Sequence, residues 1–264
     1  MIKFWNYTRE YKLLRKEIIT KVDKTISKGV TFFGNELKSF ESNFLKKYKS
    51  KFGIAVGSGT DALLISLRAI DIENGDEVIT AANTAIPTIS AIVNCGAKPR
   101  LVDVGEDYLM NTSKIEKLIN KKTKAIIPVH LYGQSCDMDK INKIAKKYKL
   151  KVIEDSADTI GYSINKKNTG KYSDVVTNSF YASHIINGAG TGGIVCFNDF
   201  KLYQKAKLLR GWGRSSATFN ESESISKRFN VKISGIDYDA KYIFSDLGYN
   251  FLPTEISAAF ALEQ

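Results

Sequence analysis

A glycine-rich segment at residues 57–63 has the composition of a phosphate-binding turn. It reads Gly-Ser-Gly-Thr-Asp-Ala-Leu, follows a short apolar run and opens an apolar stretch with helical character. Glycine lets the backbone approach a ligand closely, and the first turn of a helix presents free N–H groups and the positive end of the helix dipole. The turn and the start of the helix therefore suit a phosphate. The alternative is a strand-to-helix turn that needs glycine only for its conformation.

Acidic residues at 153–158 stand where a second ligand-binding group is expected. The segment Ile-Glu-Asp-Ser-Ala-Asp closes a predicted buried strand, and open α/β sheets bind ligands outside the carboxyl ends of their strands. The carboxylate of Asp155 suits a protonated heterocyclic nitrogen; the alternative is that Asp155 or Ser156 caps a following helix. His130 follows a predicted strand at 125–129 and is expected at the same edge, either as a packed, hydrogen-bonded residue or as a catalyst.

The elements that must position these residues alternate along the chain. Apolar residues at helical spacing alternate with short apolar runs, which predicts an α/β fold with a mostly parallel sheet covered on both faces. The first helix is expected to have an apolar row of Tyr11, Leu14, Ile18, Val22 and Ile26. Strands are predicted at 53–56, 77–80, 99–104, 125–129, 152–155, 175–180 and 193–197, and helices at 8–30, 36–49, 61–70, 88–94, 113–119, 138–148 and 253–264.

The 264 residues suffice for one large α/β domain. We expect an N-terminal helical segment at 1–30 and a large domain at 31–264. The last predicted helix stops without a cap or a glycine, so a small C-terminal domain is expected to be missing from this sequence. Residues 215–235 are polar and rich in serine, and such a long excursion within a compact domain is expected to be functional or mobile.

Composition excludes several classes of protein. The net charge is +11, but the lysines are scattered over helix-like stretches without the basic–aromatic interleaving of nucleic-acid binders. We therefore predict no nucleic-acid partner, and at most an attraction for an anionic substrate. There is no apolar run of about 18 residues and no signal-peptide pattern, so a cytoplasmic protein without a membrane-spanning helix is expected. The three cysteines have no metal-ligand spacing, which predicts reduced thiols and no metal site.

Taken together, the motifs resemble those of the DegT/DnrJ/EryC1/StrS family of PLP-dependent sugar aminotransferases. The resemblance runs from about residue 34 to the end of the chain and implies the PLP-transferase (aspartate aminotransferase) type I fold. Carried over by position, Gly59 and Thr60 would bind the cofactor phosphate through backbone N–H groups and Ser179 through its hydroxyl. Asp155 would hold the pyridine nitrogen. The matching stretches are residues 34–41, 57–63, 128–134, 154–161, 179–181, 184–193 and 248–250.

The resemblance also implies an active site that two subunits share and that lacks one aromatic residue beside the cofactor. Asn250 would reach the phosphate of the neighbouring subunit, so a homodimer is expected. Asp158 occupies a position beside the cofactor ring. Ala85 falls where the family often has an aromatic ring that stacks on the cofactor, so stacking would have to come from elsewhere.

The largest departure from the family is His184, which stands where the family keeps the lysine that holds PLP covalently. The chain has no lysine between Lys171 and Lys201. An imidazole cannot replace that covalent link, but it can move protons near neutral pH. The exchange resembles the sugar 3-dehydratase branch. That branch acts on nucleotide-linked 4-keto-6-deoxysugars with the cofactor entering as PMP, and it implies His184 as acid/base while the C3 hydroxyl leaves.

One group of these dehydratases also binds a [2Fe–2S] cluster through cysteines just after a Trp-Gly-Arg segment. Here that place reads Ser-Ser-Ala-Thr-Phe-Asn at 215–220, so no iron–sulfur cluster is predicted. The reaction would then resemble that of the cluster-free dehydratase of colitose synthesis, with glutamate as a candidate amino donor. Two alternatives stay open: a nucleotide-sugar aminotransferase whose lysine role is taken over or lost, and a non-catalytic sugar-nucleotide binder.

Overall fold

The computed structural model describes residues 6–164, 167–168, 170–218 and 228–264. Its centre is a seven-stranded sheet with the order β1-β9-β8-β5-β4-β2-β3, in which only β9 runs antiparallel to its neighbours. The strands are β1 (Phe52–Val56), β2 (Glu77–Ala81), β3 (Lys98–Val102), β4 (Thr123–Ile127), β5 (Lys151–Asp155), β8 (Val175–Ser179) and β9 (Gly193–Phe197).

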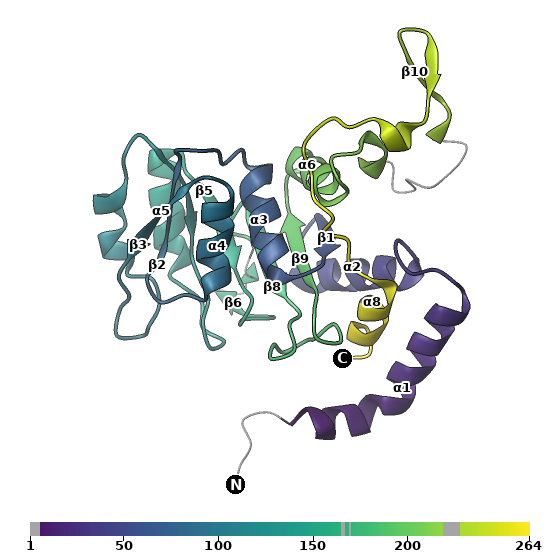
Figure 1. Cartoon of the computed structure of the whole chain (residues 1–264). Coiled ribbons are helices and arrows are strands. Elements are labelled where there is room, and N and C mark those ends of the chain that lie inside the picture. Colours follow the sequence, from purple (N-terminus) through teal and green to yellow (C-terminus); the bar gives the residue numbers. More distant parts are fainter. Residues whose placement is uncertain (1–5, 165–166, 169, 219–227) are drawn as a thin grey trace.

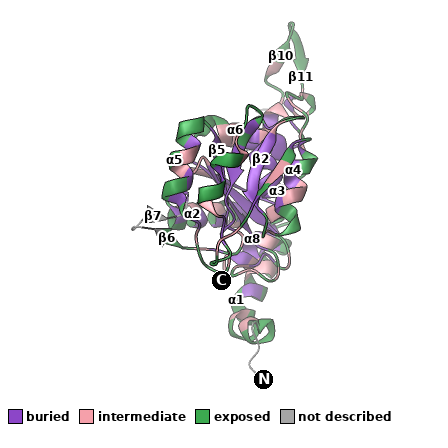
Figure 2. Ribbon diagram, turned by 90° about the vertical axis from the view of Figure 1, so that its left-hand side faces the viewer, coloured by how far each residue is buried: buried purple, intermediate pink, exposed green. Residues whose placement is uncertain are grey.

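Helices cover both faces of this sheet, so the predicted α/β class is confirmed (Figure 1). Side chains alternate along each strand: Ile54 and Val56 join the core under one helical layer, and Ala55 joins the core under the other. Figure 2 shows the sheet as the buried centre of the molecule. One layer contains α3 (Gly59–Ala69), α4 (Ile86–Asn94) and α6 (Phe200–Arg210), and the other contains α2 (Asn35–Tyr48), α5 (Met138–Tyr148) and α8 (Glu255–Ala261).

Some predicted elements differ from the structure. The helix expected at 113–119 is two short 3-10 turns, Thr112–Lys114 and Glu116–Leu118. Of this stretch only Ile115 is fully buried, whereas Leu118 and Ile119 pack against the core in part, and one fully buried side chain does not sustain an α-helix. The helix α6 was not predicted, although the side chain of Asp199 accepts hydrogen bonds from the amides of its first turn.

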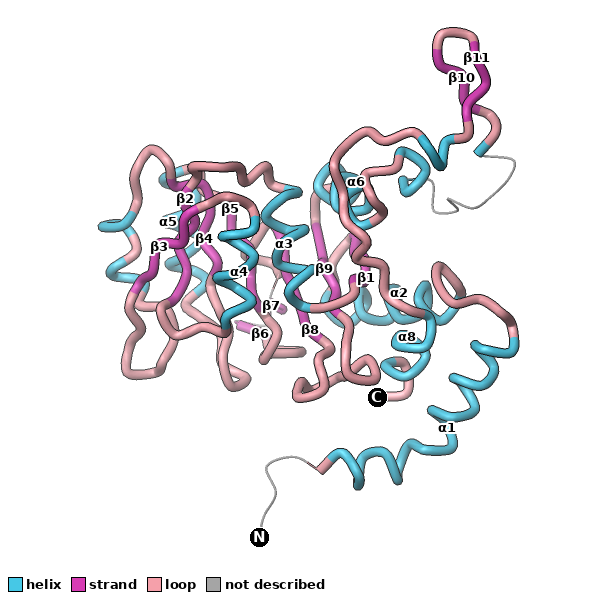
Figure 3. Tube along the Cα trace, in the orientation of Figure 1, coloured by secondary structure: helices cyan, strands magenta, loops and turns pink. Residues whose placement is uncertain are grey.

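The polar stretch at 215–235 falls partly outside the described residues. Its described parts are a 3-10 turn, Ser215–Thr218, and residues 228–235 with β10 (Val231–Ile233), which forms a hairpin with β11 (Ile236–Tyr238) just after the stretch. Figure 3 shows this hairpin projecting from the body of the protein. A second small hairpin is formed by β6 (Ser163–Ile164) and β7 (Lys167–Asn168).

The N-terminal helix α1 (Tyr7–Ser27) lies against α8 and reaches away from the sheet (Figure 1). Ile18 is buried, as its place in the predicted apolar row requires. Tyr11 and Ile26 of the same row are 39% and 57% exposed, so the row is packed only in part. The reason is that α1 packs against α8 and pairs Lys21 with Glu36 of α2, instead of lying on the sheet. In the described part of the chain, no helix combines the length and apolarity needed to cross a bilayer.

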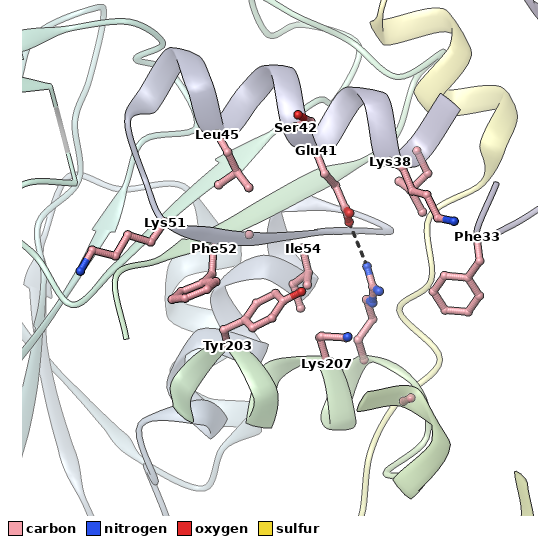
Figure 4. A pocket seen from close by; sticks show the side chains of 14 residues that line it. Phe33, Lys38, Glu41, Ser42, Leu45, Lys51, Phe52, Ile54, Tyr203 and Lys207 are labelled. Carbon is pink, nitrogen blue, oxygen red and sulfur yellow. Dashed lines mark hydrogen bonds and ion pairs between the residues drawn. The ribbon is translucent and has the colours of Figure 1, made fainter. Parts of the chain in front are cut away.

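The edge strand β1 is closed by side chains instead of another strand. A cavity of about 510 Å³ lies beside β1, between α2 and α6. Figure 4 shows side chains that line it. The amide of Ala55 donates to Glu41 Oε1 at 2.8 Å, and its carbonyl accepts from the Arg210 guanidinium at 2.7 Å. The two side chains form an ion pair at 3.3 Å. Glu41 and Arg210, which we call the edge clamp, thus satisfy backbone groups that an adjacent strand would otherwise pair.

We expect Glu41→Ala to lower the free energy of unfolding by about 1–3 kcal/mol, because the change leaves Arg210 and the Ala55 amide without their charged partner. Urea denaturation would measure this. The matched control is Ser42→Ala, the exposed neighbour on the same helix, which should stay within about 0.5 kcal/mol of the unchanged protein. Equal effects of the two substitutions would contradict a stabilising clamp.

Candidate active site

The glycine-rich segment forms the start of α3, as predicted. The Ser58 side chain caps the helix by accepting a hydrogen bond from the Asp61 amide at 3.1 Å. Gly59 is the first helical residue and Thr60 the second. Their N–H groups belong to the first turn, which has no acceptors within the helix, so they are available to an anion.

Ser179 lies directly beside this helix start. A Cβ atom built on Gly59 would lie 2.5 Å from the Ser179 Cβ and 2.9 Å from its Oγ. Only glycine therefore lets the end of β8 approach α3 so closely. The same holds for Gly193 of β9, whose added Cβ would lie 2.4 Å from the Ser58 carbonyl oxygen. The three residues predicted to bind a phosphate, Gly59, Thr60 and Ser179, thus form one group.

Asp155 ends β5 with its carboxylate buried, at 5% exposure. Its Oδ2 accepts from the Thr88 hydroxyl at 2.8 Å and its Oδ1 from the Ala157 amide at 3.3 Å. Burial raises the pKa of this carboxyl, whereas the hydrogen bonds from Thr88 and Ala157 act against that rise. No helix begins in the residues directly after β5, so the alternative of a helix cap is wrong.

Thr88 is a site residue that the sequence did not reveal. It lies in the first turn of α4, and its hydroxyl also contacts the Thr84 hydroxyl at 2.8 Å. Thr84 can donate to Thr88, which then donates to Asp155 and fixes the orientation of the carboxylate. The only signal in the sequence was a polar residue within an apolar helix.

Ala85 is the exposed N-cap of this helix and offers only a methyl group.

His184 and Asp158 meet at the same edge of the sheet. Asp158 follows β5 and His184 follows β8, and these strands are neighbours. His184 Nδ1 lies 3.1 Å from Asp158 Oδ1, with the side chains 16% and 44% exposed. The Tyr181 ring meets the imidazole edge-on at 6.2 Å between centroids. The imidazole is therefore held between two side chains and still reaches solvent.

His130 is a packed residue rather than a catalyst. It is 1% exposed, and its Nε2 lies 2.9 Å from Glu154 Oε2. The Cys136 amide donates to its Nδ1 at 3.3 Å, so both ring nitrogens have partners. Glu154 Oε1 also accepts from the Gly170 amide and the Ser173 hydroxyl, at 2.8 and 2.5 Å. The first of the two predicted roles for His130 is correct.

Asn250 lies outside this group. It pairs with Gly211 in an isolated bridge and lines a separate cavity of about 460 Å³ together with Trp212, Arg214 and Lys241. The Arg214 guanidinium lies over the Trp212 ring, 4.2 Å from its centroid. Within one chain, the other six predicted residues gather at the carboxyl edge of the sheet: Gly59, Thr60, Asp155, Asp158, Ser179 and His184.

This arrangement fits a phosphorylated pyridine. The start of α3 and the Ser179 hydroxyl suit its phosphate, and the buried Asp155 carboxylate suits a protonated ring nitrogen. His184 offers a base but no amine for covalent attachment. The described cysteines, Cys95, Cys136 and Cys196, are buried and unpaired.

The fold and the site thus define a PLP-type α/β domain of the aminotransferase kind. A profile of the "DegT/DnrJ/EryC1/StrS aminotransferase family" matches residues 12–264, and the chain belongs to this family.

Relatives of this chain include enzymes that act on nucleotide sugars. It is 38% identical to a dTDP-3-amino-3,6-dideoxy-α-D-galactopyranose transaminase of Aneurinibacillus thermoaerophilus, over 90% of this chain and 68% of that protein. Among solved structures, S. venezuelae DesV superposes with a TM-score of 0.84 at 29% identity, covering 98% of this chain and 63% of DesV. A GDP-4-keto-6-deoxymannose-3-dehydratase shares the fold, with a TM-score of 0.82 at 23% identity over 99% and 66% of the two chains. The chain spans between about half and two thirds of the length of the curated relatives it matches.

Proposed function

We propose that this chain is the cofactor-binding part of an enzyme that removes the C3 hydroxyl of a nucleotide-linked 4-keto-6-deoxysugar, with PMP as cofactor and His184 as acid/base. The observation that carries the proposal is the residue at position 184. It lies at the carboxyl edge of the sheet beside Asp158, and the resemblance puts it where the family keeps its lysine. The protein would then keep the groups that suit the cofactor and have a proton carrier in place of an amine.

The roles follow from the positions of the side chains. Gly59, Thr60 and Ser179 would hold the cofactor phosphate, and Asp155, fixed by Thr88, would hold the ring nitrogen. When bound, PMP supplies an amine for the C4 ketone of the sugar and an electron-withdrawing ring. The imidazole would take up a proton and later deliver one to the departing hydroxyl.

Further parts of the proposal concern partners. Asn250 would reach the cofactor phosphate of a second subunit in a homodimer, because in its own chain it lines a different cavity. Glutamate is the proposed amino donor that regenerates PMP. The net charge of +11 would favour the approach of a nucleoside diphosphate. A C-terminal small domain would complete the enzyme.

Transamination of a nucleotide sugar is the second candidate, and the transaminases among its relatives favour it. A transaminase needs an amine to hold PLP between half-reactions. In this chain the nearest lysines to position 184 are Lys171 and Lys201, thirteen and seventeen residues away. The absence of a lysine near position 184 in the sequence is the reason to rank dehydration first.

The deciding experiment is mass spectrometry of products formed by the purified protein with PMP, glutamate and a panel of nucleotide-linked 4-keto-6-deoxysugars. We expect a 3-deoxy product that is lighter than its substrate by one oxygen atom. A product with an amine in place of the ketone would refute dehydration and support transamination. If neither product forms and PMP gives no absorbance change near about 330 nm, the chain is a binder without catalysis.

A further inference from the structure

We propose that Asp158 positions His184 by holding the proton of that ring on Nδ1, which leaves Nε2 as the atom that accepts and returns protons. This inference rests on the proposed function for its catalytic consequence. The contact itself is a property of the chain alone. It joins the loop after β5 to the loop after β8 through Asp158 Oδ1 and His184 Nδ1, which lie 3.1 Å apart.

The geometry leaves one sensible assignment of the proton. At 3.1 Å the two atoms are within hydrogen-bonding distance, and a carboxylate oxygen can only accept. A neutral imidazole has one N–H, so contact with the carboxylate favours that hydrogen on Nδ1. The lone pair is then on Nε2, on the opposite side of the ring from Asp158.

The backbone and a neighbouring ring hold the imidazole in this orientation. The His184 amide donates to the Tyr181 carbonyl at 2.9 Å, which closes a tight turn after β8. The Tyr181 ring stands edge-on to the imidazole. Asp158 adds the remaining restraint, because its contact with Nδ1 opposes rotation of the imidazole about the Cβ–Cγ bond. A ring turned over would present Nδ1 instead of Nε2 to a ligand.

The second histidine of the chain shows what a purely structural pair looks like. His130 and Glu154 are both fully buried, and each nitrogen of His130 has a protein partner. His184 differs because its ring is partly exposed and Asp158 engages only Nδ1. Asp158 is therefore a positioning residue for a base that keeps one nitrogen available.

The test reads the position of the proton directly, without cofactor. The chain has two histidines, so ¹⁵N-imidazole NMR of histidine-labelled protein gives two ring systems, recorded at a pH of about 8, above the ordinary histidine pKa of about 6.5. We expect His184 to have its proton on Nδ1. In Asp158→Ala the ratio of the Nδ1–H to the Nε2–H form should fall about tenfold, while the His130 signals stay unchanged.

Asp103→Ala is the matched control, because Asp103 follows β3 and forms an exposed ion pair with Lys114. It should leave both histidines unchanged. In turnover, Asp158→Ala should lower kcat about tenfold and change KM less than about twofold.

An unchanged His184 tautomer in Asp158→Ala would overturn the inference, whatever the activity. A shifted tautomer with unchanged kcat would refute the positioning role. If the protein dehydrates no sugar at all, the proposed function fails, and the NMR result alone still decides whether Asp158 sets the tautomer.

Discussion

Replacing His184 with asparagine is expected to lower turnover by about 10²–10⁴-fold, the range that a positioned acid–base group contributes. Asparagine is polar and of similar reach but has no titratable nitrogen. The change does not alter the residues predicted to bind the cofactor phosphate, which are Gly59, Thr60 and Ser179. The affinity for PMP should therefore stay within about threefold. Single-turnover kinetics with PMP and sugar would measure the first quantity, and a PMP titration the second.

The partner variant His184→Lys separates the two candidate functions. It restores the amine that the family uses, at a position held by the Tyr181 turn. If the unchanged protein is inert in dehydration and His184→Lys transaminates robustly, transamination is the ancestral activity and dehydration is refuted. Retention of full turnover by His184→Asn would also exclude His184 as the acid/base.

The largest loss of stability is expected for Glu154→Ala, about 3–5 kcal/mol, because the change leaves several buried hydrogen-bond donors without an acceptor. Glu154 is fully buried and accepts hydrogen bonds from three donors, namely His130, Gly170 and Ser173. All three donors would lose their acceptor in a dry environment. Urea unfolding followed by circular dichroism gives the free energy of unfolding.

Glu116→Ala is the matched control for this prediction. The carboxylate of Glu116 forms an ion pair with Lys147 at 3.1 Å, but both side chains are largely exposed. Exposed pairs contribute about 0–1 kcal/mol, so the control should be nearly neutral. Similar losses for the two variants would show that burial is not the source of the effect.

The sequence predicted the fold well wherever apolar periodicity was strong. The predicted limits of α5 and β9 coincide with Met138–Tyr148 and Gly193–Phe197. The sequence did not reveal that β9 runs antiparallel, because an apolar run buried on both faces has the same pattern in either direction. The apolar spacing at 113–119 also predicted an α-helix, but the structure has two short 3-10 turns there.

The candidate site was predictable to the extent that it consists of local motifs. Gly59, Asp155 and His184 were found from their own segments. The residues that orient them were not, because they come from distant parts of the chain: Thr88 is 67 positions away from Asp155. The contact between Asp158 and His184 likewise depends on the adjacency of β5 and β8, which only the three-dimensional structure gives.

The edge clamp has a consequence for how copies of this chain can associate. A foreign strand could extend the sheet at β1 only after displacing Glu41 and Arg210 from Ala55. At the other end, β3 reads Lys-Pro-Arg-Leu-Val, and its proline has no N–H to offer while its basic residues repel a like copy. Both ends of the sheet thus resist intermolecular strand pairing, which limits aggregation and leaves assembly to helices and loops.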